Sequence, residues 1–162
     1  MSQQRSFNFM QQPEIFKALL GLSAGYENST LEYALLELVK LRASQINGCG
    51  FCVDMHTKDA RLEGETEQRL YLTSVWREAP GLYTEREQAA LAWTEAVTKL
   101  ENQHVPDAVY DQARAQFSDK ELAQLTLAVV AINGWNRFNI AFNAPAGSYK
   151  AGSLKAMHAR AS

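Results

Sequence analysis

The sequence lacks any strong excess of one charge: sixteen Lys and Arg oppose eighteen Asp and Glu, giving a formal net charge of −2. A basic field for nucleic acid, or a polybasic segment for an anionic membrane, is therefore not expected. Long apolar runs are also missing. Residues 125–132 form one of the longest such stretches and fall well short of the roughly 20 residues needed to cross a bilayer. The first sixteen residues lack the apolar run of a signal peptide. These absences predict a soluble cytoplasmic protein.

Cysteine is scarce, since the chain of 162 residues has only two. Two cysteines cannot build the disulfide framework of a small secreted protein. Both lie in one CxxC motif, Cys49-Gly50-Phe51-Cys52, and in a reducing compartment such a motif is more often catalytic or metal-binding than a structural bridge. Zinc prefers four ligands, and no second CxxC or HxxxH supplies the rest. We expect no metal and no cofactor, although a zinc-binding or structural CxxC stays open as an alternative.

The sequence does contain enough apolar residues, 46% against 21% charged, for one folded domain. No alternating strand pattern of useful length occurs, so the fold class expected is all-α, with about seven helices. We interpret residues 1–162 as a single domain with its core at about 15–142. Residues 1–12 are expected to form an N-terminal arm. The tail, 143–162, is expected to be either a mobile end or an arm that docks on a partner subunit.

Start and stop signals place the expected helices. Three capping-box patterns, at residues 29–32, 84–87 and 118–121, open three of them. Pro13 and Pro106 begin two more, and the Asn47-Gly48 break separates the second helix from a third that starts at or near Cys49. The expected helices cover approximately residues 13–22, 29–46, 49–63, 66–76, 84–100, 106–117 and 118–142.

The stretch from Glu37 to His56 carries the candidate chemistry. At helical spacing, Cys49, Cys52 and His56 share one face, which brings a thiol within reach of an imidazole. The helix N-terminus favours a thiolate at Cys49, whereas His56 favours one at Cys52. Glu37 could orient the imidazole if the second and third helices pack antiparallel, as the short break suggests. Separately, each residue has a plainer interpretation: Glu37 could pair with Lys40 on a solvated face, and His56 could be a core histidine.

Taken together, Glu37-x11-Cys49-x2-Cys52-x3-His56 resembles the signature of the alkylhydroperoxidase D-like (AhpD-like) family, within the carboxymuconolactone decarboxylase superfamily. The resemblance extends to Asn133-x-Trp135-Asn136-Arg137 in the last long helix. It implies an AhpD-like helical domain that assembles as a homotrimer or homohexamer and has thiol-dependent peroxidase activity.

The resemblance also implies roles for four residues. Cys52 would attack the peroxide, and Cys49 would be the more accessible thiol that resolves the product into a disulfide. His56 and Glu37 would form the proton relay that activates Cys52. One position departs from the best-known branch, which has a histidine where this chain has Phe51. That branch is served by lipoyl-type dithiols, and nothing in the sequence indicates a lipoyl-binding surface.

The function expected is therefore reduction of hydrogen peroxide or small organic hydroperoxides through a Cys49–Cys52 dithiol/disulfide cycle. An external dithiol or protein reductant, lipoyl-like or thioredoxin-like, would close the cycle. Two alternatives stay open. One is a thiol–disulfide oxidoreductase that uses peroxide poorly. The other is a non-enzymatic helical oligomer that senses redox state or binds zinc.

Overall fold

The computed structural model describes residue 5, residues 11–27 and residues 29–153, and within these ranges it is all-helical without a strand. Between the α-helices named below lie the short 3₁₀ helices η2 (Thr73–Glu78), η3 (Pro80–Leu82) and η4 (Glu101–Gln103). The expected fold class is confirmed, and the CxxC lies at the start of the third helix. The α-helices are α1 (Pro13–Glu27), α2 (Tyr33–Asn47), α3 (Gly50–Leu62), α4 (Glu67–Leu72), α5 (Glu85–Lys99), α6 (Asp107–Gln116) and α7 (Asp119–Ala141).

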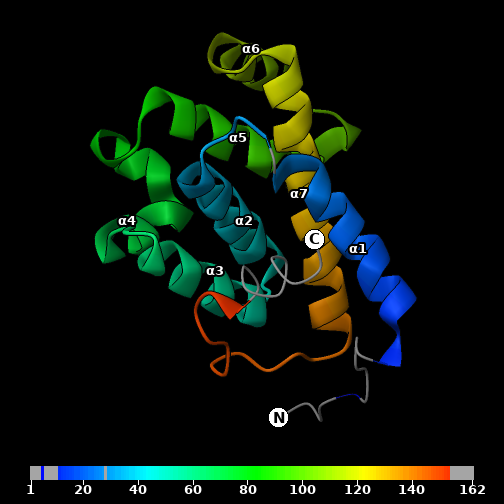
Figure 1. Ribbon diagram of the computed structural model, residues 1–162. Helices are drawn as coiled ribbons and strands as arrows, with labels where there is room; N and C mark the ends of the chain where they lie inside the picture. The colour runs from blue at the N-terminus through cyan, green and yellow to red at the C-terminus, as the bar shows by residue number, and fades with distance from the viewer. Residues whose placement is uncertain (1–4, 6–10, 28, 154–162) are drawn as a thin grey trace.

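Helix α2 runs through the middle of the molecule (Figure 1). It packs against α3, α5 and α7, while α1 lies along α7 on the outside. Eight of the fifteen residues of α2 are buried, so it is enclosed on most sides rather than amphipathic. The candidate site residue that α2 supplies, Glu37, therefore lies in the interior of the protein.

Two of the three expected capping boxes are present. Thr84 and Ser118 each accept a hydrogen bond from the backbone N–H of the glutamate three residues on. The side chain of that glutamate accepts in turn from the backbone N–H of the capping residue. The third prediction, at residues 29–32, is wrong. There α2 begins only at Tyr33 after an extended Glu32, and Ser29 Oγ instead accepts from the Leu31 N–H at 3.2 Å. The serine stabilises the turn before the helix and not the helix itself.

Two helix ends also differ from expectation. Helix α1 continues to Glu27 and does not stop at residue 22. The reason is that Gly25 is a packing residue: a Cβ there would lie 2.5 Å from Leu127 Cδ2 of α7, so glycine permits the close approach of the two helices. The helix expected over 66–76 is divided, because α4 ends at Leu72 and the chain continues as η2, with Val75 outside helical geometry.

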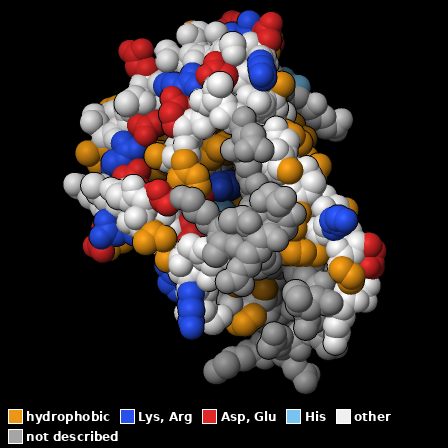
Figure 2. Space-filling model, in the orientation of Figure 1, with side chains coloured by type: hydrophobic (Ala, Val, Ile, Leu, Met, Phe, Trp, Pro, Cys, Tyr) orange, Lys and Arg blue, Asp and Glu red, His pale blue; other side chains and the backbone are white. Residues whose placement is uncertain are grey.

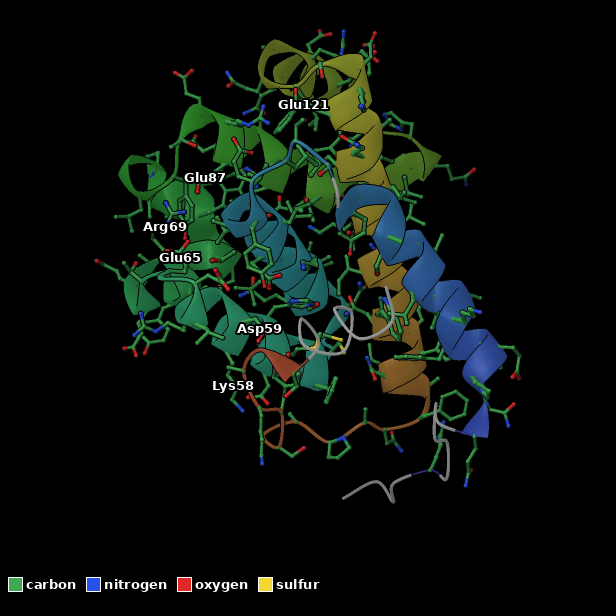
Figure 3. All side chains as sticks on the ribbon, in the orientation of Figure 1. Lys58, Asp59, Glu65, Arg69, Glu87 and Glu121 are labelled. Atoms are coloured by element: carbon green, nitrogen blue, oxygen red, sulfur yellow. The ribbon has the colours of Figure 1, made fainter. Side chains whose placement is uncertain are left out.

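Residues 143–153, which we name the C-terminal strap, leave the end of α7 and return along α3 (Figures 1 and 3). Asp54 accepts from the Gly147 N–H at 3.0 Å, and Lys58 Nζ donates to the Tyr149 carbonyl at 3.0 Å. Asp59 accepts from the Tyr149 hydroxyl at 2.8 Å. The part of the tail that the structure describes is thus fastened to a helix of its own chain.

The surface carries both signs of charge. In Figure 2, acidic and basic side chains are interspersed over α4 and α5 and form no field of one sign. Figure 3 shows Glu65, Arg69 and Glu87 grouped where α4 meets α5, and Arg69 Nε lies 2.9 Å from Glu65 Oε1. No helix within the described ranges is long and apolar enough to cross a membrane.

Candidate active site

A tight reversal between α2 and α3 builds the site. Gly48 ends α2 in the left-handed region, at φ 71°, where glycine has no steric penalty. Cys49 then caps α3 in an extended conformation. The two helices pack side by side, and Glu37 and His56, nineteen residues apart in the chain, meet with Oε2 and Nδ1 separated by 2.9 Å. The antiparallel pairing inferred from the Asn47-Gly48 break therefore brings this carboxylate and this imidazole together.

Glu37 is a buried charge, with an exposed fraction of 2%. Its second oxygen, Oε1, pairs with the Lys40 ammonium one turn further along α2. Burial alone would raise the pKa of this carboxyl, but the Lys40 charge and then His56 outweigh burial and bring the pKa to about 2. The Glu37–Lys40 pair considered from the sequence does exist, but it lies inside the protein and not on a solvated face.

His56 is held in one tautomer by this arrangement. An ionised carboxylate can only accept a hydrogen bond, so Nδ1 of the neutral imidazole carries the proton and donates it to Glu37. The lone pair is then on Nε2. That atom is buried and has no hydrogen-bond partner within the described part of the chain. A buried, oriented imidazole with an unsatisfied acceptor nitrogen can serve as a general base.

The two cysteines are free and adjacent, with their sulfurs 2.8 Å apart. Both are buried, at 1% exposure for Cys49 and 0% for Cys52, so the structure offers little of the difference in accessibility that the resemblance implies. A hydrogen bond from Cys52 lowers the pKa of Cys49 to about 7, although burial opposes ionisation. The same hydrogen bond, together with burial, raises the pKa of Cys52. In the resting dithiol, the thiolate therefore belongs to Cys49.

Helix α7 supplies amide groups to the sulfurs. Asn139 Nδ2 donates to Cys52 Sγ at 3.3 Å. Asn136 is fully buried, donates to Ser44 Oγ at 3.0 Å and accepts from Asn47 Nδ2 at 2.9 Å. Asn136 also lowers the pKa of both thiols through hydrogen bonding. From the sequence, Asn136 stood out only as part of a motif and Asn139 was missed, although Asn139 follows it by three residues and so shares its helix face.

Apolar side chains enclose the remaining sides of the thiols. Ala43 and Ile132 are buried against them, and Phe51 and Trp135 pack on the same cluster. The Phe51 ring contacts the Tyr149 ring of the C-terminal strap edge-on, with centroids 6.4 Å apart. Phe51 thus has an apolar contact where a histidine would add a proton-transfer group. The described residues contain no group of three or more His, Cys, Asp or Glu side chains that could hold a metal ion.

Comparison with known proteins finds a family and a relative that this chain matches. Residues 13–96 match the model of the carboxymuconolactone decarboxylase family. The chain is 39% identical to the uncharacterized protein YdfG of Bacillus subtilis (strain 168) over 148 residues, which are 91% of this chain and 99% of YdfG.

Two solved structures share the architecture. A protein of unknown function from Agrobacterium tumefaciens, described as a candidate antioxidant defence protein AhpD, is 45% identical with a TM-score of 0.83, covering 90% of this chain and 99% of its own. An uncharacterized peroxidase-related protein with an alkylhydroperoxidase AhpD core, from Ralstonia eutropha JMP134, has a TM-score of 0.75. It covers 86% of this chain and 74% of its own, and at 17% identity it supports the fold alone.

Proposed function

Because the chain belongs to the AhpD-like branch of the carboxymuconolactone decarboxylase family, we propose that it is a thiol-dependent peroxidase of hydrogen peroxide or small organic hydroperoxides. The family includes enzymes, and the Agrobacterium relative is itself described as a candidate antioxidant protein. The observation that carries the proposal is the pair of buried sulfurs 2.8 Å apart, on the same helix as an imidazole oriented by a buried carboxylate.

The first step is oxidation of Cys52. His56 Nε2 takes the Cys52 proton, and the Cys52 thiolate attacks the terminal oxygen of R–O–O–H. The S–O bond forms as the O–O bond breaks, and the leaving alkoxide takes the proton from the imidazolium to give the alcohol. The raised pKa of Cys52 makes this base necessary, and the hydrogen bond from Asn139 stabilises the thiolate that forms.

The second step joins the two sulfurs. The Cys49 sulfur, as its thiolate, attacks the sulfenic sulfur of Cys52. The S–S bond forms as the S–O bond breaks, and hydroxide leaves with the proton that Cys49 gave up, as water. A disulfide needs a separation of about 2.05 Å, so the sulfurs move together by less than roughly 1 Å. Two exchange reactions with an external dithiol then return both thiols.

A thiol titration tests the cycle. Reduced protein should lose both free thiols per chain when treated with cumene hydroperoxide, and should consume peroxide continuously when dithiothreitol is supplied. Cys52→Ser should abolish turnover and leave the circular dichroism spectrum unchanged. Cys49→Ser should accumulate a sulfenic acid at Cys52 that dimedone traps. Full turnover by Cys52→Ser, or dimedone labelling of Cys49 in that variant, would overturn the assigned roles.

The second candidate is a thiol–disulfide oxidoreductase that uses peroxide poorly. It is favoured by the lowered pKa of Cys49 at the start of α3, a feature that also serves disulfide exchange. Rates with a small disulfide substrate and with cumene hydroperoxide, measured on one preparation, separate the two candidates.

We also propose assembly as a homotrimer or homohexamer. Support comes from three exposed apolar side chains on successive helices, Leu62, Tyr71 and Val75. Light scattering at micromolar concentration tests this, and a monomer would refute it.

A further inference from the structure

We propose that Lys40 is a positioning residue of the site, whose ammonium holds the Glu37 carboxylate charged and aimed at His56 Nδ1 so that Nε2 is left as the base. This inference deepens the proposed function and rests on His56 acting on a thiol. The Lys40 ammonium pairs with Glu37, and its effect on the thiols passes through Glu37 and His56.

The two oxygens of the Glu37 carboxylate form ion pairs with different partners. Glu37 Oε1 pairs with Lys40 Nζ, and Oε2 accepts from His56 Nδ1 at 2.9 Å. Lys40 is itself largely enclosed, with 15% of its side chain exposed, and its ammonium lies 5.7 Å from the centre of the Tyr33 ring. Both carboxylate oxygens are thereby engaged in fixed directions, and the carboxylate cannot turn away from the imidazole without breaking the ion pair.

The charge of Lys40 determines whether Nε2 of the His56 imidazole keeps the lone pair that accepts a proton. Without it, a carboxylate that is 2% exposed has no full positive charge beside it. One outcome is that Glu37 takes up a proton and donates it to Nδ1, which moves the ring proton to Nε2. The other outcome is that His56 becomes an imidazolium to balance the buried anion, so that both nitrogens carry protons. In either case, Nε2 loses the lone pair that would accept the thiol proton.

The other groups around Glu37 do not replace this charge. On α2, Tyr33 lies next to the carboxylate, and burial and then the negative charge of Glu37 raise the pKa of its hydroxyl, which therefore stays neutral. On α3, the Asp59 carboxyl brings no positive charge, and it accepts hydrogen bonds from the Tyr149 hydroxyl and the Gly152 N–H of the C-terminal strap. Among the described groups facing Glu37, only Lys40 combines a permanent positive charge at neutral pH with direct contact.

Lys40→Met tests the inference, with Lys99→Met as the matched control because Lys99 pairs with Glu101 at 3.7 Å on an exposed surface. The first measurement is the ¹⁵N spectrum of the imidazole, assigned by comparison with His56→Gln. Wild type and Lys99→Met should show Nδ1 protonated and Nε2 unprotonated at pH 7. Lys40→Met should show Nε2 protonated. The conservative Lys40→Arg should restore the wild-type pattern.

The second measurement is the rate at which iodoacetamide alkylates Cys52 across pH, made in the Cys49→Ser background so that the Cys49 thiolate does not contribute. It needs no peroxide turnover. In Lys40→Met, the midpoint of the profile should rise by about one pH unit, and the rate at pH 7 should fall about tenfold. If Lys40→Met does not fold, Lys40→Gln, which keeps a donor without the charge, takes its place. Unchanged ¹⁵N shifts and an unchanged profile in a folded variant would overturn the inference. If wild type fails to reduce peroxide but the spectra change as expected, the proposed function fails and the role of Lys40 stands.

Discussion

Two buried glutamates in this molecule have similar surroundings, but only one of them contacts a side chain that can transfer a proton. Glu37 of α2 is 2% exposed, and Glu95 of α5 is 8% exposed. Both have a lowered pKa because cationic or donor side chains outweigh the effect of burial. Glu95 accepts hydrogen bonds from Arg42 Nε at 2.7 Å and Trp76 Nε1 at 3.0 Å, and it also pairs with Arg77. By charge and burial alone, the two sites would look alike.

Their partners distinguish them. A guanidinium and an indole N–H do not give up a proton in the physiological range, so the bonds to Glu95 can only hold α2, η2 and α5 together. An imidazole can exchange a proton there, and His56 has one nitrogen bound to Glu37 and the other unsatisfied. A perturbed carboxyl is thus a weak sign of a functional site unless one of its partners can transfer a proton.

The largest expected effect comes from Glu37→Gln, which keeps the shape of the side chain but removes the charge that orients His56. Peroxide-dependent oxidation of the thiols should slow by about 100-fold at pH 7, the lower part of the range for loss of general acid–base catalysis. Stopped-flow loss of free thiols measures this, with circular dichroism as the check on folding. A wild-type rate in this variant would remove the distinction between the two glutamates.

Glu95→Gln should instead lower the stability of the protein and leave the rate of thiol oxidation unchanged. Replacing the acceptor of two arginines and a tryptophan should lower the free energy of unfolding by about 2 kcal/mol, typical for lost charge-assisted hydrogen bonds. The melting temperature should fall by roughly 4–8 °C for a chain of this size. The rate per folded molecule should stay at the wild-type value. A loss of rate at preserved stability would assign Glu95 to the site as well.

A smaller effect is expected in the pH dependence of stability. The Glu37 carboxyl has a pKa of about 2 in the folded protein against 4.5 as its ordinary value, so folding favours its ionised form. This contribution to stability is fully present above about pH 4.5 and is lost as pH falls toward 2. Urea unfolding at a series of pH values should therefore show the difference between wild type and Glu37→Gln shrinking below pH 4.5. A difference that is constant down to pH 3 would contradict the lowered pKa.

Much of the site could be predicted from the sequence because its signals are local. Helical spacing places Cys52 and His56 one turn apart, and the Asn47-Gly48 break indicates that α2 turns back against α3. Burial was harder to predict. Lys40 lies three residues from Glu37 on the same helix, a pattern that usually marks a solvated pair, and only the packing around α2 encloses it.

Other features depend on contacts between distant residues. Asn139 meets Cys52 across 87 positions of sequence, and an amide near the end of α7 gives no sign of its partner. Gly25 is similar, since glycine usually signals a helix end but here allows close packing on Leu127. The motif at residues 29–32 has the composition of a capping box, yet its serine bonds to the turn before the helix.

The C-terminal strap has a consequence for the order in which the protein is completed. Its residues, 143–153, leave the ribosome after helices α1 to α7, because synthesis proceeds from the N-terminus. Until then, the outer side of α3, with Phe51 and the carboxylates of Asp54 and Asp59, has none of its contacts to the strap. This face of α3, beside the CxxC turn, is therefore covered only after α1 to α7 have been synthesised.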